Sequence, residues 1–162
     1  MSERSGIGYD SHRLAAGRRL LIGGVEVPHE AGLEGHSDAD VLAHAVIDAL
    51  LGAAALGDIG EHYPDSDERW RGADSIALLR EVVAMLAGEG LEIEHVDCTV
   101  LIEAPKLAPH RQAIRASLAG ALGVDVGRVN VKATTGERMG FVGRGEGVGA
   151  LAVASLTGAA DR

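Results

Sequence analysis

One stretch of the chain decides its fold class: residues 37–56 read SDADVLAHAVIDALLGAAAL. Apolar side chains recur in it every three or four residues, a period typical of an amphipathic helix. The start, Ser37-Asp-Ala-Asp40, is of the capping-box type, so we expect the helix to begin there and to run to about Leu56. This helix must bury its apolar face against another layer. That face comprises Val41, Leu42, Ala45, Ile47, Leu50 and Leu51.

The segments around this helix predict strands and two further helices. We expect strands over Ser5–Asp10, Leu91–Ile102, Val129–Ala133 and Gly147–Ser155, and a hairpin over Arg19–Pro28 that turns at Gly23-Gly24. We expect helices over Asp74–Ala87 and Pro109–Leu122, and loops over Ala31–His36 and Gly57–Arg71. The pattern favours an α+β fold, a mixed α/β sandwich with about four to five strands in one sheet and three main helices on one side.

The composition excludes several function classes. A length of 162 residues fits one domain, spanning 1–162. The chain has 15 Lys and Arg against 24 Asp and Glu, a net charge of −9 that argues against nucleic-acid and membrane partners. Aromatic residues make up only 2%, too few for a base-stacking platform. The single Cys98 and the lack of a signal-peptide core lead us to expect a cytoplasmic protein.

Three residues in the N-terminal third are candidate ligands of one metal ion. Asp10 and His12 are two apart on a predicted strand, so their side chains share a face. His44 lies in the second helical turn, where Asp48, four residues on, can orient its imidazole. Together the three would form a zinc site with an open fourth position. The alternatives are a polar pair at a strand end, which the local sequence favours, and a core histidine with one hydrogen bond.

Two polar segments are candidate contacts for an anion or a polyol. His36 and Ser37 precede the long helix, whose N-terminal amides favour an anion. Ser37 can equally be a simple N-cap. Gly57–Asp67 combines glycines, which allow a close backbone approach, with carboxylates that accept hydrogen bonds from hydroxyl groups. A solvated acidic loop is the alternative, and the local sequence favours it.

Two further segments are candidate phosphate sites. Ile102–His110 joins a strand to a helix and carries Lys106, a point charge suited to phosphate. In Lys132–Glu146, the hydroxyls of Thr134 and Thr135 can donate to phosphate, and Glu137 can hold a hard divalent cation. Arg144 can meet phosphate or form an ion pair between chains. The alternatives are an ordinary connection and a Gly-rich turn with local threonine caps. In combination, the segments indicate a small phosphorylated substrate.

The same motifs make the chain resemble the 2-C-methyl-D-erythritol 2,4-cyclodiphosphate synthase family of the non-mevalonate isoprenoid pathway, over almost its whole length. The resemblance implies a reaction on 4-diphosphocytidyl-2-C-methyl-D-erythritol 2-phosphate, in which the 2-phosphate attacks the β-phosphorus and CMP leaves. The matching stretches include Gly8–His12, Leu33–His44, Gly57–Gly60, Pro64–Asp67, Gly72–Ser75, Ala104–Lys106, Val129–Thr135, Glu137 and Gly140–Gly147.

The resemblance also implies roles for individual residues. Asp10, His12 and His44 match zinc ligands, and Glu137 matches a position that helps hold a second divalent ion, Mg²⁺ or Mn²⁺. His36 and Thr135 match residues that stabilise the transition state. The positions implied to contact substrate are Asp10, Ser11, His12, His36, Ser37, Asp58, Ile59, Gly60, Tyr63, Pro64, Asp65, Ser66, Asp67, Ile102, Glu103, Ala104, Pro105, Lys106, Leu107, Ala108, Thr134, Thr135, Gly136, Glu137, Phe141 and Arg144.

The family resemblance further implies a homotrimer with active sites between neighbouring subunits. A cavity on its threefold axis would hold an isoprenoid diphosphate, and Arg144 matches a position implicated in gripping that phosphate. Two other functions compete with the cyclase. A metal-dependent phosphohydrolase would release free phosphate from an activated water. A non-catalytic sensor of isoprenoid diphosphate would use the same trimer without chemistry.

Overall fold

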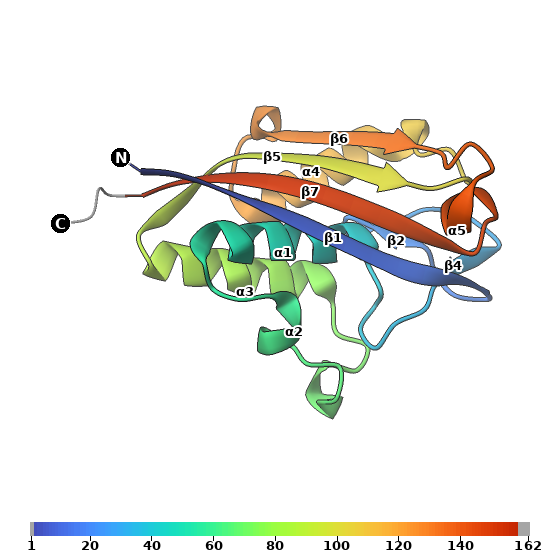
Figure 1. Cartoon of the computed structure of the whole chain (residues 1–162), viewed down its shortest axis with the longest axis horizontal. Coiled ribbons are helices and arrows are strands. Elements are labelled where there is room, and N and C mark those ends of the chain that lie inside the picture. The colour runs from blue at the N-terminus through green and yellow to red at the C-terminus, as the bar shows by residue number, and fades with distance from the viewer. Residues whose placement is uncertain (1, 159–162) are drawn as a thin grey trace.

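A mixed five-stranded sheet forms one layer of the protein (Figure 1). The structure is a computed structural model and describes residues 2–158. The strand order is β4-β1-β7-β5-β6. These strands are β1 (Ser2–Ala16), β4 (Ala31–Leu33), β5 (Leu91–Leu101), β6 (Val129–Thr134) and β7 (Gly147–Gly158). A separate hairpin joins β2 (Leu21–Ile22) to β3 (Val25–Glu26).

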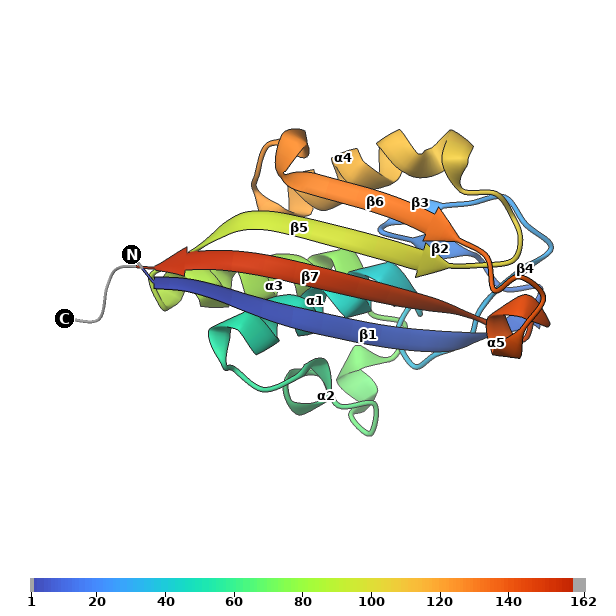
Figure 2. The same cartoon turned by 45° about the horizontal axis from the view of Figure 1, so that its top comes forward.

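Three helices form the second layer: α1 (Val41–Ala54), α3 (Ser75–Gly88) and α4 (Arg111–Leu122). Two short helices, α2 (Ile59–His62) and α5 (Gly140–Gly143), lie outside this layer. In Figures 1 and 2, α1, α3 and α4 lie on the same side of the sheet, where α1 packs against β1 and β7 and α4 packs against β6. In the described part of the chain, no helix is long and apolar enough to cross a membrane.

Strand direction decides which segments meet at the edges of the sheet. β7 runs antiparallel to β1 and β5, whereas β5 and β6 are parallel, with Leu101 opposite Thr134. The segments that follow these two parallel strands therefore leave the sheet side by side. This pairing brings the loop after Leu101 next to the loop after Thr134, although more than thirty residues separate them in sequence.

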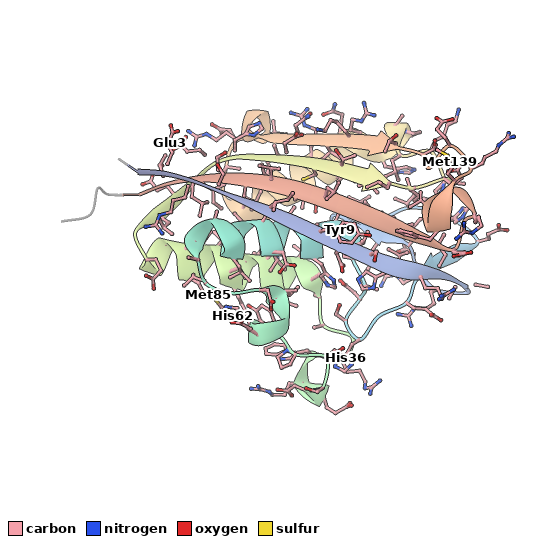
Figure 3. All side chains as sticks on the ribbon, in the orientation of Figure 1. Glu3, Tyr9, His36, His62, Met85 and Met139 are labelled. Carbon is pink, nitrogen blue, oxygen red and sulfur yellow. The ribbon has the colours of Figure 1, made fainter. Side chains whose placement is uncertain are left out.

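The two faces of the sheet differ in burial. Alternate residues of β7, such as Ala150 and Ala152, are fully covered by the helices. On the opposite face, Ile7 and Tyr9 of β1 stand across from Val153 and Leu151 of β7, and all four are exposed, from 38% to 70%. Since a monomeric protein rarely exposes a contiguous apolar patch, this open face has the character of an interface. Figure 3 labels Tyr9 on β1.

Two glycines bring α1 unusually close to β1. A Cβ atom at Gly8 would lie 1.9 Å from the carbonyl oxygen of Ala45, and one at Gly6 would lie 2.1 Å from that of Ala49. No side chain fits between backbones at this distance, so only glycine allows the contact. The helix is consequently held directly against the strand, backbone to backbone.

Most of the expected elements are present, and the differences have physical reasons. The hairpin at Gly23-Gly24 and the two helices and three strands predicted after residue 73 are confirmed. The expected cap at Ser37 is wrong, because Asp40 caps α1 and accepts from the amide of Ala43. Strand β1 is longer than expected, and Ala31–Leu33 pairs with its far end instead of forming a loop. Gly57–Arg71 includes the short helix α2 and a 3₁₀ turn, Glu68–Trp70.

The cap at Asp40 also ties the hairpin to the helix. Its fully buried carboxylate accepts hydrogen bonds from the amides of Gly23, at 2.8 Å, and Gly24, at 2.6 Å. Burial raises the pKa of this carboxyl group, against the effect of its three backbone donors. The β2–β3 hairpin is therefore attached at the N-terminus of α1, beside the candidate metal ligands.

Candidate metal centre and substrate site

The side chains of Asp10, His12 and His44 converge on one point between β1 and α1. Asp10 and His12 lie two residues apart on β1 and face the helix, and His44 projects from the first turns of α1. One potential ligand atom from each lies within 4.8 Å of the others. Asp10 Oδ2 is 2.7 Å from His12 Nε2 and 3.1 Å from His44 Nδ1, and the two nitrogens are 3.2 Å apart. The structure thus brings together the three predicted ligands.

The second nitrogen of each imidazole is engaged by another part of the protein. His12 Nδ1 donates to the carbonyl oxygen of Glu34 at 2.7 Å. His44 Nε2 lies 2.8 Å from Ser75 Oγ and 3.1 Å from Ser37 Oγ. These contacts leave His12 Nε2 and His44 Nδ1 directed at Asp10. One carboxylate and two oriented imidazoles suit a borderline metal such as zinc, and they leave a coordination position for another ligand.

The expected partner of His44, Asp48, has a different role, so that prediction is wrong. Asp48 Oδ1 accepts from the amide of Ile59 at 2.8 Å and so holds the first residue of α2. Burial raises the pKa of this carboxyl group, partly offset by the same hydrogen bond. The residue that does contact His44 Nε2 is Ser75, the first residue of α3. Nothing in its local sequence distinguishes it from an ordinary helix start.

The charges at the centre favour a cation. Burial raises the pKa of Asp10, but the hydrogen bonds and charges of His12 and His44 outweigh burial and lower it to about 2. Burial lowers the pKa of His12, and the hydrogen bond and charge of Asp10 reverse this, so that the net shift is upward. An ionised carboxylate is therefore held in a largely enclosed place, with its side chain 26% exposed.

A hollow of about 410 Å³ opens beside this centre. His36 lies at its rim, where its Nε2 donates to the carbonyl oxygen of Asp67 at 3.0 Å, and Figure 3 shows it near the loop between α2 and α3. Asp58 caps α2 by accepting from Glu61. The hydroxyl of Tyr63 donates to Glu81 at 3.0 Å. The predicted residues that line this hollow are His12, His36, Ser37, His44, Ile59, Gly60, Tyr63, Pro64 and Asp65.

A second hollow, of about 320 Å³, lies where β5 and β6 end. The amide of Gly136 donates to the Glu103 carboxylate at 2.9 Å, which joins the two loops. Thr135 Oγ1 donates to Glu137 at 3.3 Å, and Glu137 adopts a positive φ of 51°. The predicted residues that line it are Ile102, Glu103, Pro105, Lys106, Leu107, Ala108, Thr134, Thr135 and Glu137.

The remaining predicted residues lie outside these two hollows. Ser11 is on the opposite face of β1 from Asp10 and His12, because side chains alternate along a strand. Ser66 is exposed in the loop before Asp67. Phe141, on α5, packs over the place where Gly147 and Gly149 lack a side chain. Arg144 is exposed and pairs with Glu146 at 2.8 Å. Ala104 is exposed beside the second hollow.

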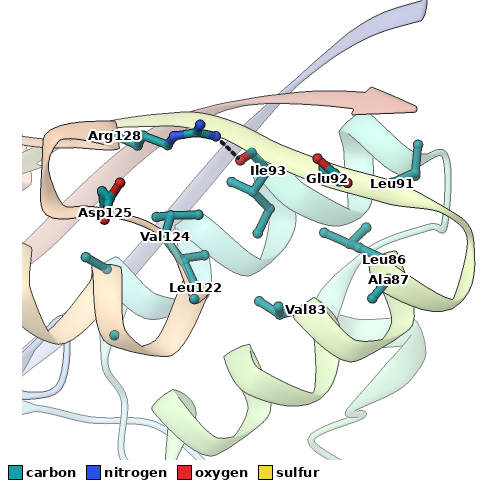
Figure 4. A pocket seen from close by; sticks show the side chains of 13 residues that line it. Val83, Leu86, Ala87, Leu91, Glu92, Ile93, Leu122, Val124, Asp125 and Arg128 are labelled. Atoms are coloured by element: carbon teal, nitrogen blue, oxygen red, sulfur yellow. Dashed lines mark hydrogen bonds between the residues drawn. The ribbon is translucent and has the colours of Figure 1, made fainter. Parts of the chain in front are cut away.

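A third hollow, of about 610 Å³, is larger than these two and is lined by none of the predicted residues. It lies between α3, α4 and the start of β5 (Figure 4), where Arg128 donates to the carbonyl oxygen of Ile93 at 3.2 Å. Most of the residues that line it are aliphatic, such as Val83 and Leu86. The candidate site is therefore distinguished from this hollow by its converging titratable groups and not by its size.

Comparisons with known proteins show the family of this chain. The sequence profile of the YgbB family matches residues 3–157. Proteins named 2-C-methyl-D-erythritol 2,4-cyclodiphosphate synthase are similar to it: that of Alkaliphilus oremlandii is 57% identical over 94% of this chain and 98% of its own length, and that of Burkholderia thailandensis is 59% identical over 95% of both. A solved structure titled as this synthase in a CDP-bound form is 38% identical, covers 95% of this chain and all of its own, and superposes with a TM-score of 0.88. The chain therefore belongs to the YgbB family.

Proposed function

We propose that this protein converts 4-diphosphocytidyl-2-C-methyl-D-erythritol 2-phosphate to 2-C-methyl-D-erythritol 2,4-cyclodiphosphate and CMP, in the cytoplasmic synthesis of isoprenoid precursors. The observation that carries the proposal is the convergence of Asp10, His12 and His44 beside a hollow. It is supported by relatives of that name at 57% identity and more over nearly their full length. We also propose that residues 1–162 act as one domain.

The reaction is an intramolecular phosphoryl transfer. An oxygen of the 2-phosphate forms a bond to the β-phosphorus, and the bond from that phosphorus to the oxygen shared with the α-phosphorus breaks. CMP leaves with that oxygen. Little covalent chemistry is required of the protein, so catalysis depends on folding the substrate, aligning the attack and stabilising charge. An enclosed site that excludes water also prevents hydrolysis from competing with cyclisation.

Zn²⁺ held by Asp10, His12 and His44 would supply a positive charge and a template for phosphate oxygens. Glu137 would hold a second divalent ion, Mg²⁺ or Mn²⁺, near the diphosphate. The hydroxyls of Thr134 and Thr135, with the amides around Gly136, would donate to the diphosphate, and His36 and Thr135 would stabilise the transition state. The Ile102–Ala108 loop would bind the cytidine of the substrate. The hollow beside the metal centre, which Ser37 also lines, would bind its methylerythritol part.

We further propose a homotrimer with its active sites between subunits. In support of this, the metal centre lines one hollow, and the loop that carries Thr134, Thr135 and Glu137 lines another. Two neighbouring subunits would bring one hollow of each kind to the same substrate. The exposed apolar patch of Ile7, Tyr9, Leu151 and Val153 is suited to burial against two further copies. In that arrangement, a cavity on the threefold axis near Arg144 would accept an isoprenoid diphosphate.

Phosphorus NMR of the metal-replete protein with the cytidine diphosphate substrate tests the function. The expected products are the cyclic diphosphate and CMP, in equal amounts. Inorganic phosphate in place of the cyclic product would contradict the proposal and indicate a phosphohydrolase. An unchanged spectrum from folded, metal-loaded protein would refute catalysis and favour a binding role. Loss of the cyclic product in His44→Ala, with the fold retained, is expected if the metal centre is required.

A further inference from the structure

We propose that Ser75 and Asp38 are positioning residues that orient His44 toward the metal. Ser75 would act through a hydrogen bond to the imidazole, and Asp38 would act through Ser75. Neither residue would contact substrate. This inference rests on the proposed metal-binding role of Asp10, His12 and His44. It assigns a function to a buried serine and a carboxylate that lie outside the ligand set.

The three side chains form a continuous hydrogen-bonded chain. His44 Nε2 is 2.8 Å from Ser75 Oγ, and the Ser75 hydroxyl donates to Asp38 Oδ1. The Ser75 amide donates to the other carboxylate oxygen of Asp38 at 3.0 Å, and the Asp40 amide donates to Oδ1 at 3.1 Å. Ser75 is 0% exposed, so its hydroxyl has no access to water as an alternative partner.

The direction of this chain follows from the chemistry of its ends. An ionised aspartate only accepts hydrogen bonds, so the single hydroxyl proton of Ser75 must point to Asp38. The Ser75 oxygen is then an acceptor for His44, which requires the proton of the imidazole to reside on Nε2. The lone pair of the ring is thereby left on Nδ1, the nitrogen that lies 3.1 Å from Asp10 Oδ2. The carboxylate of Asp38 thus selects the tautomer of His44 that can bind a metal.

The same contacts hold three distant segments together. Asp38 belongs to the loop before α1, His44 to α1 and Ser75 to the start of α3. The amide of Asp38 also donates to the carbonyl oxygen of Ala73 at 3.0 Å, which fixes the loop beside α3. Ser37 Oγ, at 3.1 Å from His44 Nε2, is a weaker candidate because it is partly exposed and accepts from the Ala39 amide. Ser75 is therefore the principal partner of the imidazole.

Zinc binding by the full-length chain, measured by competition with a chromophoric chelator, tests this role. In Ser75→Ala the imidazole loses its buried acceptor, and we expect zinc affinity to fall about 10- to 100-fold, the range typical of such outer partners. The matched control is Asp74→Ala. Asp74 is the neighbouring residue and caps α3 through the amides of Ile76 and Ala77, without contact to His44. This control should lose helix stability but keep wild-type zinc affinity.

Three outcomes of this experiment are informative. Wild-type zinc affinity in folded Ser75→Ala overturns the inference and leaves the metal centre standing. An equal loss in Ser75→Ala and Asp74→Ala also overturns it, because the effect would then come from the start of α3 in general. If the wild-type chain does not bind zinc, or His44→Ala binds it as well as wild type does, the proposed metal centre itself fails.

A measurement on the unaltered protein keeps the proposal testable if Ser75→Ala does not fold. Long-range ¹H–¹⁵N spectra of histidine-labelled, zinc-loaded protein distinguish a metal-bound Nδ1 from a metal-bound Nε2. We expect His44 to show zinc on Nδ1 and a slowly exchanging proton on Nε2. Zinc on Nε2, or a rapidly exchanging Nε2 proton, would overturn the assignment of Ser75 as its acceptor.

Discussion

The contact between Gly8 and α1 determines where His44 stands relative to Asp10 and His12. Gly8 lies two residues before Asp10 on the same face of β1, and Ala45 is adjacent to His44 on α1. In Gly8→Ala, the new Cβ atom would be 1.9 Å from the Ala45 carbonyl oxygen, whereas an ordinary contact is at least 3.4 Å. The helix must therefore move away from the strand by about 1.5 Å, or the strand must bend.

The loss in free energy of unfolding expected for Gly8→Ala is at the upper end of the range for overpacked cores. Extra methylene groups in a packed core cost about 1–3 kcal/mol when side chains can adjust. The obstacle at Gly8 is backbone, so we expect about 3 kcal/mol, or a fall of roughly 6–12 °C in melting temperature for a chain of this size. Metal–ligand distances tolerate deviations of only about 0.2 Å, so a displaced His44 should also lose the metal.

Thermal unfolding and zinc content measured on the same preparations test both effects. The matched control is Gly52→Ala, on the same helix. Its Cβ atom would lie 3.8 Å from the Ile7 carbonyl oxygen, an ordinary contact, so this variant should bind zinc normally and be as stable as wild type or more so. If Gly8→Ala kept both the melting temperature and the zinc content of wild type, the close approach would not be what positions His44.

Three other perturbations have definite expected results. Val153→Asp places a charge on the open face of the sheet and should convert the proposed trimer, three times 16.7 kDa, to smaller species in a sedimentation experiment. The control Val126→Asp changes an exposed valine of the 3₁₀ turn before β6 and should leave the trimer intact. Glu103→Ala removes the acceptor of the Gly136 amide and should weaken CDP binding measured by calorimetry, whereas Glu103→Gln should restore the affinity. Equal affinities of wild type and both variants would refute the role of Glu103 in positioning the Gly136 loop. Burial raises the pKa of the Cys98 thiol to about 12, so at pH 8 it should react with a thiol reagent roughly 1,000-fold more slowly than a free cysteine, until urea is added. Because the folded state retains this proton more tightly than the unfolded chain, Cys98 should also make the protein less stable as the pH rises above about 9. A fast reaction without urea would contradict the burial of this thiol.

Sequence patterns were sufficient for elements that depend on neighbouring residues. The 3.6-residue period predicted α1, and the alternation of apolar residues predicted β5, because both report which side of an element is covered. Gly23-Gly24 predicted the hairpin from turn chemistry alone. The candidate ligand set was accessible in part, since Asp10 and His12 share a strand face and imidazole is a common zinc ligand, although the local sequence alone favoured a polar pair at a strand end.

Other features depend on partners that are remote in the chain. Ala31–Leu33 forms a strand because it pairs antiparallel with Leu14–Ala16 at the end of β1, and the local sequence does not indicate this pairing. Asp40, not Ser37, caps α1, because a buried carboxylate there also satisfies the hairpin amides. His44 pairs with Ser75, thirty-one residues away, in preference to Asp48 on its own helix, since Asp48 is engaged by the amide of Ile59.

The residue types and their spacing thus determine which chemistry this chain can perform, because ligand atoms and helix faces are properties of short segments. The orientation of those atoms depends on the folded protein. The approach of α1 to β1 at Gly8 places His44 beside Asp10, and the start of α3 supplies a hydrogen-bond partner for the second nitrogen of His44. Such contacts arise from packing between layers, where a buried polar group must find a partner wherever the fold provides one.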